Sequence, residues 1–201
     1  MLVGIITTPK RQQYLSQLLA SVTPYADKTF VYNDLEMQGA TYNQSRILRE
    51  VLPLAKPNEP VLMLDDDMVL TDNWYEDWQK IHEQAQADTY VLFTRHRHLL
   101  KYEAISRGWT KGLFKNSLYT CAIIYINQPD LADQVDQWYE TRGKELLTEK
   151  RAKHYDVVLQ TYFVDNGHEY VVTTPTLADH IGVQSTLGHQ IGGSPMYKGN
   201  H

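Results

Sequence analysis

Four apolar residues run directly into three aspartates in the segment Val61-Leu62-Met63-Leu64-Asp65-Asp66-Asp67. A short, continuous apolar run predicts a strand that is buried on both faces. Ligands of α/β sheets bind beyond the carboxyl ends of the strands, which is where these aspartates stand. The segment therefore predicts a buried strand that ends at a functional edge of a sheet.

Similar apolar runs alternate with amphipathic segments along the rest of the chain. The predicted strands are Leu2–Thr7, Thr29–Asn33, Val61–Leu64, Thr89–Thr94, Tyr119–Ile126 and Glu169–Thr173. The predicted helices are Arg11–Val22, Thr41–Leu52, Asn73–Ala87, Pro129–Arg142 and Tyr155–Asn166. A long loop is expected over His96–Ser117, a charged connection over Lys144–Lys153, and irregular chain from Thr174 onward. This alternation predicts an α/β sandwich with a mostly parallel central sheet flanked by helices.

Composition limits the class of protein. The 201 residues suffice for one domain with a sizeable core, and a formal net charge of −5 gives no general case for binding nucleic acid or membranes. Cys121 is the one cysteine, so no internal disulfide can form. No basic leader with a following apolar stretch begins the sequence. A cytoplasmic protein is the resulting expectation.

Polar residues follow three of the predicted strands. These clusters are Thr7-Thr8, Asn33-Asp34 and Asp65-Asp66-Asp67. Because the carboxyl ends of parallel strands meet at one edge, we expect the clusters to face one crevice.

The aspartates suit a hard divalent cation. Residues i and i+2 of an extended segment point the same way, so Asp65 and Asp67 are expected to share a face while Asp66 points elsewhere. Mg²⁺ or Mn²⁺ takes oxygen ligands, typically one or two carboxylates together with phosphate oxygens. A solvated turn, with Asp72 capping the next helix, is the alternative that spacing leaves open.

A second enzyme class shares this motif. The order Asp65-Asp66-Asp67-Met68-Val69 also fits the nucleophile motif of haloacid-dehalogenase-like phosphatases. Those enzymes usually carry the motif on their first strand and need a later lysine and a paired-acid motif. Here the motif follows the third predicted strand, so the phosphatase is the less favoured alternative.

Four segments, in order, resemble a GT-A-type glycosyltransferase. They are Gly4–Arg11 (GIITTPKR), Leu62–Asp67 (LMLDDD), Tyr155–Leu159 (YDVVL) and Pro175–Ser185 (PTLADHIGVQS). The resemblance implies a GT-A-like domain over residues 1–185. A glycine-rich tail over residues 186–201 could close over the donor as a lid.

The resemblance also implies a role for each matching residue. Asp156 would be the catalytic base, and Asp67 and His180 would hold Mn²⁺ or Mg²⁺ at the diphosphate. The donor, with UDP as the favoured nucleotide, would be bound by Thr7, Thr8, Arg11, Asp34, Arg46, Asp65, Asp66 and Ser185. One base implies a single displacement with inversion. Relatives often carry a Glu-Asp pair where this chain has Tyr155-Asp156, and if Asp156 only caps its helix, a retaining reaction is favoured instead.

A basic segment raises the question of the acceptor. Arg95–Lys115 holds six Lys or Arg and one acid, with aromatic residues between the charges. Such a segment suits a polyanion, and DNA bearing a hydroxylated base is one specific candidate. The alternatives are a solvated loop paired with the acidic remainder, and a protein that binds nucleotide or nucleic acid without catalysis.

Overall fold

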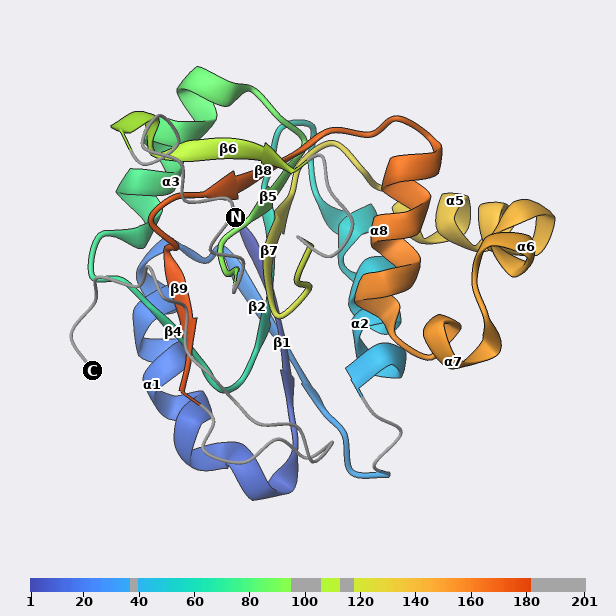
Figure 1. The fold of residues 1–201 in the computed structure, drawn as a ribbon. Helices are drawn as coiled ribbons and strands as arrows, with labels where there is room; N and C mark the ends of the chain where they lie inside the picture. The colour runs from blue at the N-terminus through green and yellow to red at the C-terminus, as the bar shows by residue number, and fades with distance from the viewer. Residues whose placement is uncertain (37–39, 95–105, 113–117, 182–201) are drawn as a thin grey trace.

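The computed structural model describes residues 1–36, 40–94, 106–112 and 118–181 (Figure 1). In this part of the chain, seven strands form one sheet in the order β2-β1-β3-β7-β5-β8-β6. They are Leu2–Thr7 (β1), Lys28–Asn33 (β2), Val61–Asp65 (β3), Thr89–Val91 (β5), Trp109–Gly112 (β6), Ala122–Tyr125 (β7) and Tyr170–Thr173 (β8). A second sheet pairs Met68–Leu70 (β4) with Ala178–His180 (β9).

Helices cover both faces of the large sheet (Figure 1). The longer ones are Gln12–Val22 (α1), Ala40–Glu50 (α2), Trp74–Ala85 (α3), Leu131–Trp138 (α5) and Tyr155–Asp165 (α8). Short helical segments are Pro9–Arg11 (η1), Thr23–Tyr25 (η2), Leu52–Leu54 (η3), the π-helical Tyr139–Gly143 (η5), Lys144–Leu146 (α6) and Glu149–Ala152 (α7). No helix within the described residues has both the length and the apolar character needed to cross a membrane.

Strand alternation divides the core into two layers. On β3, Val61 and Met63 belong to the cluster under α2, α5 and α8, whereas Leu62 and Leu64 belong to the cluster under α1 and α3. Successive side chains of a strand point to opposite faces, so a continuous apolar strand serves both layers. This is the predicted α/β sandwich.

The sheet is mixed but mostly parallel. β7 runs antiparallel to β3 and β5, and β6 runs antiparallel to β8, while the other five strands share one direction. The register aligns Thr7 with Asn33 and Ile6 with Asp65. The carboxyl ends of β1, β2 and β3 are therefore level, which brings their polar residues to one edge.

Two local predictions are wrong. β6 lies inside the segment expected to be loop, and β9 lies in chain expected to be irregular. The charged connection contains the short helices α6 and α7. β6 (WTKG) and β9 (ADH) lack the apolar run that marks the predicted strands, and they form here because distant partners supply their hydrogen bonds. The predicted tail, residues 186–201, and the end of the predicted domain lie outside the described residues.

Candidate functional site

Asp66 fastens the end of β3 to the end of β1. Its Oδ2 accepts hydrogen bonds from Thr7 Oγ1 at 2.7 Å and from the backbone nitrogen of Thr8 at 3.4 Å. Its Oδ1 accepts from Arg11 Nη1 at 3.3 Å. Burial raises the pKa of Asp66, and the Thr7 hydroxyl opposes that rise. Asp66 is thus occupied by the protein itself, as a clamp that shapes the loop after β1.

Asp67 stands next to this clamp and is fully buried. Its Oδ2 accepts a hydrogen bond of 2.5 Å from the same Nη1 atom of Arg11. Its Oδ1 lies 3.3 Å from His180 Nε2 and has no hydrogen-bond partner within the described parts of the chain. One oxygen of Asp67 therefore accepts a hydrogen bond from the Arg11 guanidinium. The other lies near the His180 ring without forming a hydrogen bond to it.

The small sheet places His180 beside Asp67. β4 begins directly after Asp67, and its register aligns Met68 with His180. The backbone nitrogen of Ile181 donates to the Asp67 carbonyl oxygen at 3.0 Å. His180 is therefore positioned by backbone pairing between segments that lie more than a hundred residues apart in sequence.

Asp65 lies at the end of β3 toward α2. Burial is the main cause that raises its pKa to about 7, and the charges of Asp67 and Asp66 add to the rise. The Arg11 charge and a hydrogen bond from Gln44 act in the opposite direction. Oδ1 of Asp65 is buried and has no hydrogen-bond partner among the described residues.

Gln44 is a site residue that the sequence prediction missed. It is buried on α2 together with Asn43. A signal was present, because Gln44, Leu48 and Val51 follow the helical spacing of one buried face, on which a polar side chain needs a partner.

Asp156 is the second residue of α8, and His154 holds the cap position before the helix. Asp156 is half-buried, and burial raises its pKa, while a hydrogen bond from the backbone nitrogen of Val157 at 2.9 Å lowers it. The hydroxyl of Thr41 on α2 donates to the Lys153 carbonyl oxygen at 2.8 Å. We call the edge of the sheet at which Asp65, Asp66 and Asp67 lie the aspartate edge. Helix α2 thus contacts the aspartate edge through Gln44, and it also contacts the chain leading to Asp156.

The remaining predicted donor residues are divided. The backbone nitrogen of Asp34 donates to the Thr7 carbonyl oxygen at 2.8 Å, which places buried Asp34 at the same edge. Arg46 is engaged elsewhere, since it pairs with Glu50 at 3.1 Å and lies over the ring of Tyr32 at 4.8 Å. Ser185 lies outside the described residues.

The residues at this edge fit a divalent cation whose remaining ligands are substrate phosphates and water. Among the described residues, no three His, Cys, Asp or Glu side chains group so as to hold a metal ion. Asp67 and His180 form a pair instead, with the unsatisfied Oδ1 between them. Mg²⁺ commonly binds one or two carboxylates and completes its shell with substrate phosphates and water, so a pair is sufficient when a diphosphate is present.

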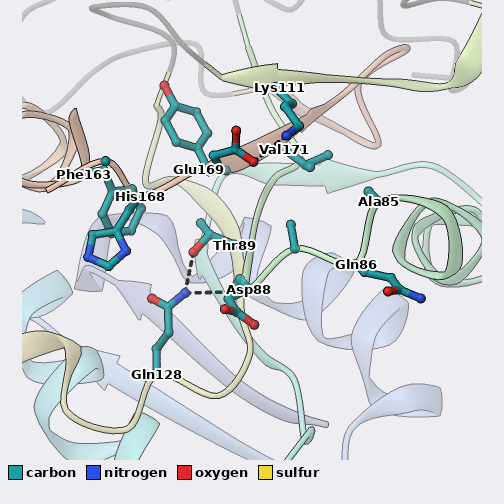
Figure 2. A pocket seen from close by; sticks show the side chains of 13 residues that line it. Ala85, Gln86, Asp88, Thr89, Lys111, Gln128, Phe163, His168, Glu169 and Val171 are labelled. Atoms are coloured by element: carbon teal, nitrogen blue, oxygen red, sulfur yellow. Dashed lines mark hydrogen bonds and ion pairs between the residues drawn. The ribbon is translucent and has the colours of Figure 1, made fainter.

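A cavity of about 270 Å³ lies at the opposite edge, where β5 and β8 begin (Figure 2). Gln128 Nε2 donates there to Thr89 Oγ1 at 2.8 Å, and Lys111 pairs with Glu169 at 2.5 Å. This cavity is separate from the aspartate edge.

Lys111 belongs to the basic segment, and its pairing with Glu169 is what the solvated-loop alternative expects. Residues 95–105 and 113–117 of this segment lie outside the described residues.

Comparison with known proteins supplies the fold rather than the chemistry. No protein-family model and no curated protein matches the sequence. Along its full length the chain is similar to all of A197 from STIV, with a TM-score of 0.53 and 13% identity. It is also similar to a glycosyltransferase involved in glycosylation of the major capsid of PBCV-1, with a TM-score of 0.47 and 13% identity over 87% of this chain and 82% of the other.

A further similarity is to residues 1–349 of S. aureus TarS, with a TM-score of 0.48 and 12% identity over 86% of this chain and 58% of that one. At 13% identity, the similarity to A197 with its TM-score of 0.53 describes a common fold, in agreement with the predicted α/β class. The function must be argued from the residues at the aspartate edge.

Proposed function

We propose that this protein is a metal-dependent glycosyltransferase that moves a sugar from a nucleoside diphosphate, with UDP favoured, to an acceptor hydroxyl. The observation that carries the proposal is the gathering of Asp66, Asp67, Arg11 and His180 where β1 and β3 end level. A cation site made of a buried carboxylate and an imidazole, next to an arginine, suits a diphosphate.

The proposed roles follow from what each side chain offers. Asp34 and Asp65 are hydrogen-bond acceptors that suit the hydroxyl or N–H groups of a sugar nucleotide. Arg11 and the backbone nitrogen of Thr8 are donors that suit phosphate oxygens. Asp67 and His180 would hold Mn²⁺ or Mg²⁺. When bound, such a cation neutralises the negative charge that builds on the leaving diphosphate.

Asp156 is proposed as the general base. The acceptor oxygen bonds to the anomeric carbon while its proton passes to the Asp156 carboxylate. The bond from that carbon to the diphosphate oxygen breaks at the same time, and the diphosphate leaves with the electron pair. A raised pKa suits this role, because a base whose pKa is closer to the working pH accepts the proton more readily. One displacement of this kind inverts the anomeric carbon.

No observation favours the phosphatase alternative. Its later acid pair would be expected at another strand end. β5 is followed by Leu92, and β8 is followed by Thr174, rather than by acids. In the described part of the chain, the acids that end a strand of the large sheet therefore belong to β2 and β3.

The test of the proposal is donor breakdown without acceptor. We expect the wild-type protein to release UDP slowly from a UDP-sugar in the presence of Mn²⁺, and to stop when excess chelator is added. Nucleoside monophosphates, which are phosphate monoesters, test the phosphatase alternative. Release of inorganic phosphate from them, with no release of a nucleoside diphosphate from any sugar nucleotide, would replace the proposal with the alternative.

A further inference from the structure

We infer that Arg11 is a built-in substitute for the divalent cation. Its guanidinium neutralises Asp66 and Asp67 while the site is empty, and it leaves Asp67 when metal and diphosphate bind together. The inference rests on the proposed function and adds a mechanism by which the two ligands depend on each other.

The need for such a substitute follows from burial. Asp66 is 2% exposed and Asp67 is 0% exposed, and they are adjacent in sequence. A buried carboxylate without a cation is strongly unfavourable. One nitrogen of Arg11, Nη1, lies 3.3 Å from Asp66 and 2.5 Å from Asp67, and the arginine side chain is itself only 15% exposed. This mostly buried pair is what makes the carboxylates tolerable before a metal arrives.

The metal and the guanidinium compete for the same carboxylate. The cation site proposed above uses Asp67, whose Oδ2 already accepts the short hydrogen bond from Arg11. A second cation on this group would be held only a few ångströms from the guanidinium, and like charges at that distance repel strongly in a buried site. Metal alone would therefore weaken the pairing of Arg11 with Asp67 and would supply no anionic group in exchange.

The loop after β1 is built so that this displacement is local. Asp66 keeps two hydrogen bonds that do not involve Arg11, from Thr7 Oγ1 at 2.7 Å and from the Thr8 nitrogen at 3.4 Å. Arg11 is the last residue of η1, only three residues beyond Thr8. The clamp can thus remain closed while the guanidinium moves.

A diphosphate supplies the new partner. Guanidinium groups pair with phosphate oxygens in the same forked geometry that they use with carboxylates. When metal and nucleotide bind together, Arg11 exchanges Asp67 for phosphate and loses little. Each ligand should therefore raise the affinity for the other, and Arg11 should account for part of that coupling.

The experiment titrates Mn²⁺ into the protein with and without UDP, and free Mn²⁺ is followed by electron paramagnetic resonance. Without UDP, Arg11→Gln should bind Mn²⁺ about tenfold more tightly than wild type, within the usual range of coupling between sites. The factor by which UDP improves Mn²⁺ binding should shrink in the same variant. Arg142→Gln is the matched control, because it breaks an ion pair with Asp165, the last residue of α8, and should leave Mn²⁺ affinity unchanged.

Arg11→Lys is a second variant that keeps the positive charge, so that folding does not depend on an uncompensated buried carboxylate. Its Mn²⁺ affinity without UDP should fall between those of wild type and Arg11→Gln. If wild type binds both Mn²⁺ and UDP but the Arg11 variants bind Mn²⁺ no more tightly, the substitute is wrong and the proposed function stands. If wild type binds neither ligand, the proposed function fails, and this inference fails with it.

Discussion

Asp156 is a single residue on which the chemistry and the stability of the protein make opposite demands. Burial raises its pKa above the ordinary value of 3.8, so the folded protein holds the proton more firmly than the unfolded chain. Stability from this group is then full at low pH and declines as the pH rises through the raised value. At neutral pH the ionised carboxylate is a cost to folding, which a functional role would explain.

We predict that Asp156→Asn lowers turnover at least about 10²-fold, the lower end of the general-base range, while donor affinity is kept. The same change should raise the melting temperature at pH 7, because the amide carries no charge and its oxygen can still accept from Val157. In wild type, turnover should fall as the pH is lowered through the raised pKa. Product formation, UDP affinity and thermal melting, each compared with Asp133→Asn on an exposed part of α5, are the measurements.

Two outcomes would count against this role. Near-normal turnover in Asp156→Asn would leave Asp156 as a residue that only stabilises the start of α8. A lower melting temperature with intact turnover would point the same way. A retaining reaction would then become the favoured form of the proposal.

At the scale of elements, the contact between β1 and α2 positions the site. Gly4 on β1 faces Ile47 on α2, and a Cβ atom added at Gly4 would lie 2.8 Å from Ile47 Cγ2. Both residues are in the well-packed layer between the sheet and α2, the helix that carries Gln44. The helix therefore depends on glycine at this position for its close approach.

We predict that Gly4→Ala destabilises the protein by about 1–3 kcal/mol, the usual range for overpacking in a core. Denaturant unfolding measures the change. Combining Gly4→Ala with Ile47→Ala should cost less than the sum of the two single changes, because the second removes the atoms that the first would meet. Strict additivity of the two would mean that this contact does not limit the approach of α2.

Long apolar strands could be predicted from the sequence, whereas the pairing of very short strands could not. Buried strands such as β1 and β3 are apolar along their whole length, so their positions and their polar ends follow from the sequence alone. The pairing of β4 with β9 could not be predicted, since three-residue strands carry no period and their register depends on the finished fold. His180 was found through a motif, but its position 3.3 Å from Asp67 comes from that pairing.

At the residue scale the same limit applies to Asp66. It was predicted to bind the donor, whereas its oxygens accept hydrogen bonds from Thr7, Thr8 and Arg11. Contacts between side chains more than fifty residues apart leave no local pattern in a sequence. Donor binding by Asp66 stays a prediction. The structure shows that Asp66 links the end of β3 to the loop after β1.

For the whole molecule, charge is unevenly distributed. The protein carries a formal net charge of −5, while the segment Arg95–Lys115 carries six basic residues and one acid. Lys111 is paired with Glu169, and Arg107 lies over the ring of Trp109 at 4.1 Å. The proposal that the acceptor is a polyanion, with DNA bearing a hydroxylated base as one candidate, rests on the remaining charges of this segment.

We predict that oligonucleotides bind at low salt, that binding weakens steeply as salt is added, and that Arg97→Glu with Lys111→Glu weakens it further. Fluorescence anisotropy at several salt concentrations is the measurement. Glu169→Gln is a useful companion variant, because it frees Lys111 from its partner and should strengthen binding. Absence of binding at low salt, with transfer to a neutral saccharide unaffected by the charge reversals, would exclude a polyanionic acceptor.

The central claim for the proposed site is that nucleotide and metal bind together at Asp67. Isothermal titration of UDP into wild type and Asp67→Ala, each with Mn²⁺ and with excess chelator, measures this directly. Asp88→Ala, at the opposite edge of the sheet, is the control. We predict that chelation weakens UDP binding to wild type at least about tenfold, within the usual range of coupling between ligands, and has little effect on Asp67→Ala. Equal UDP affinity in all four conditions would contradict a metal-bridged diphosphate at this edge.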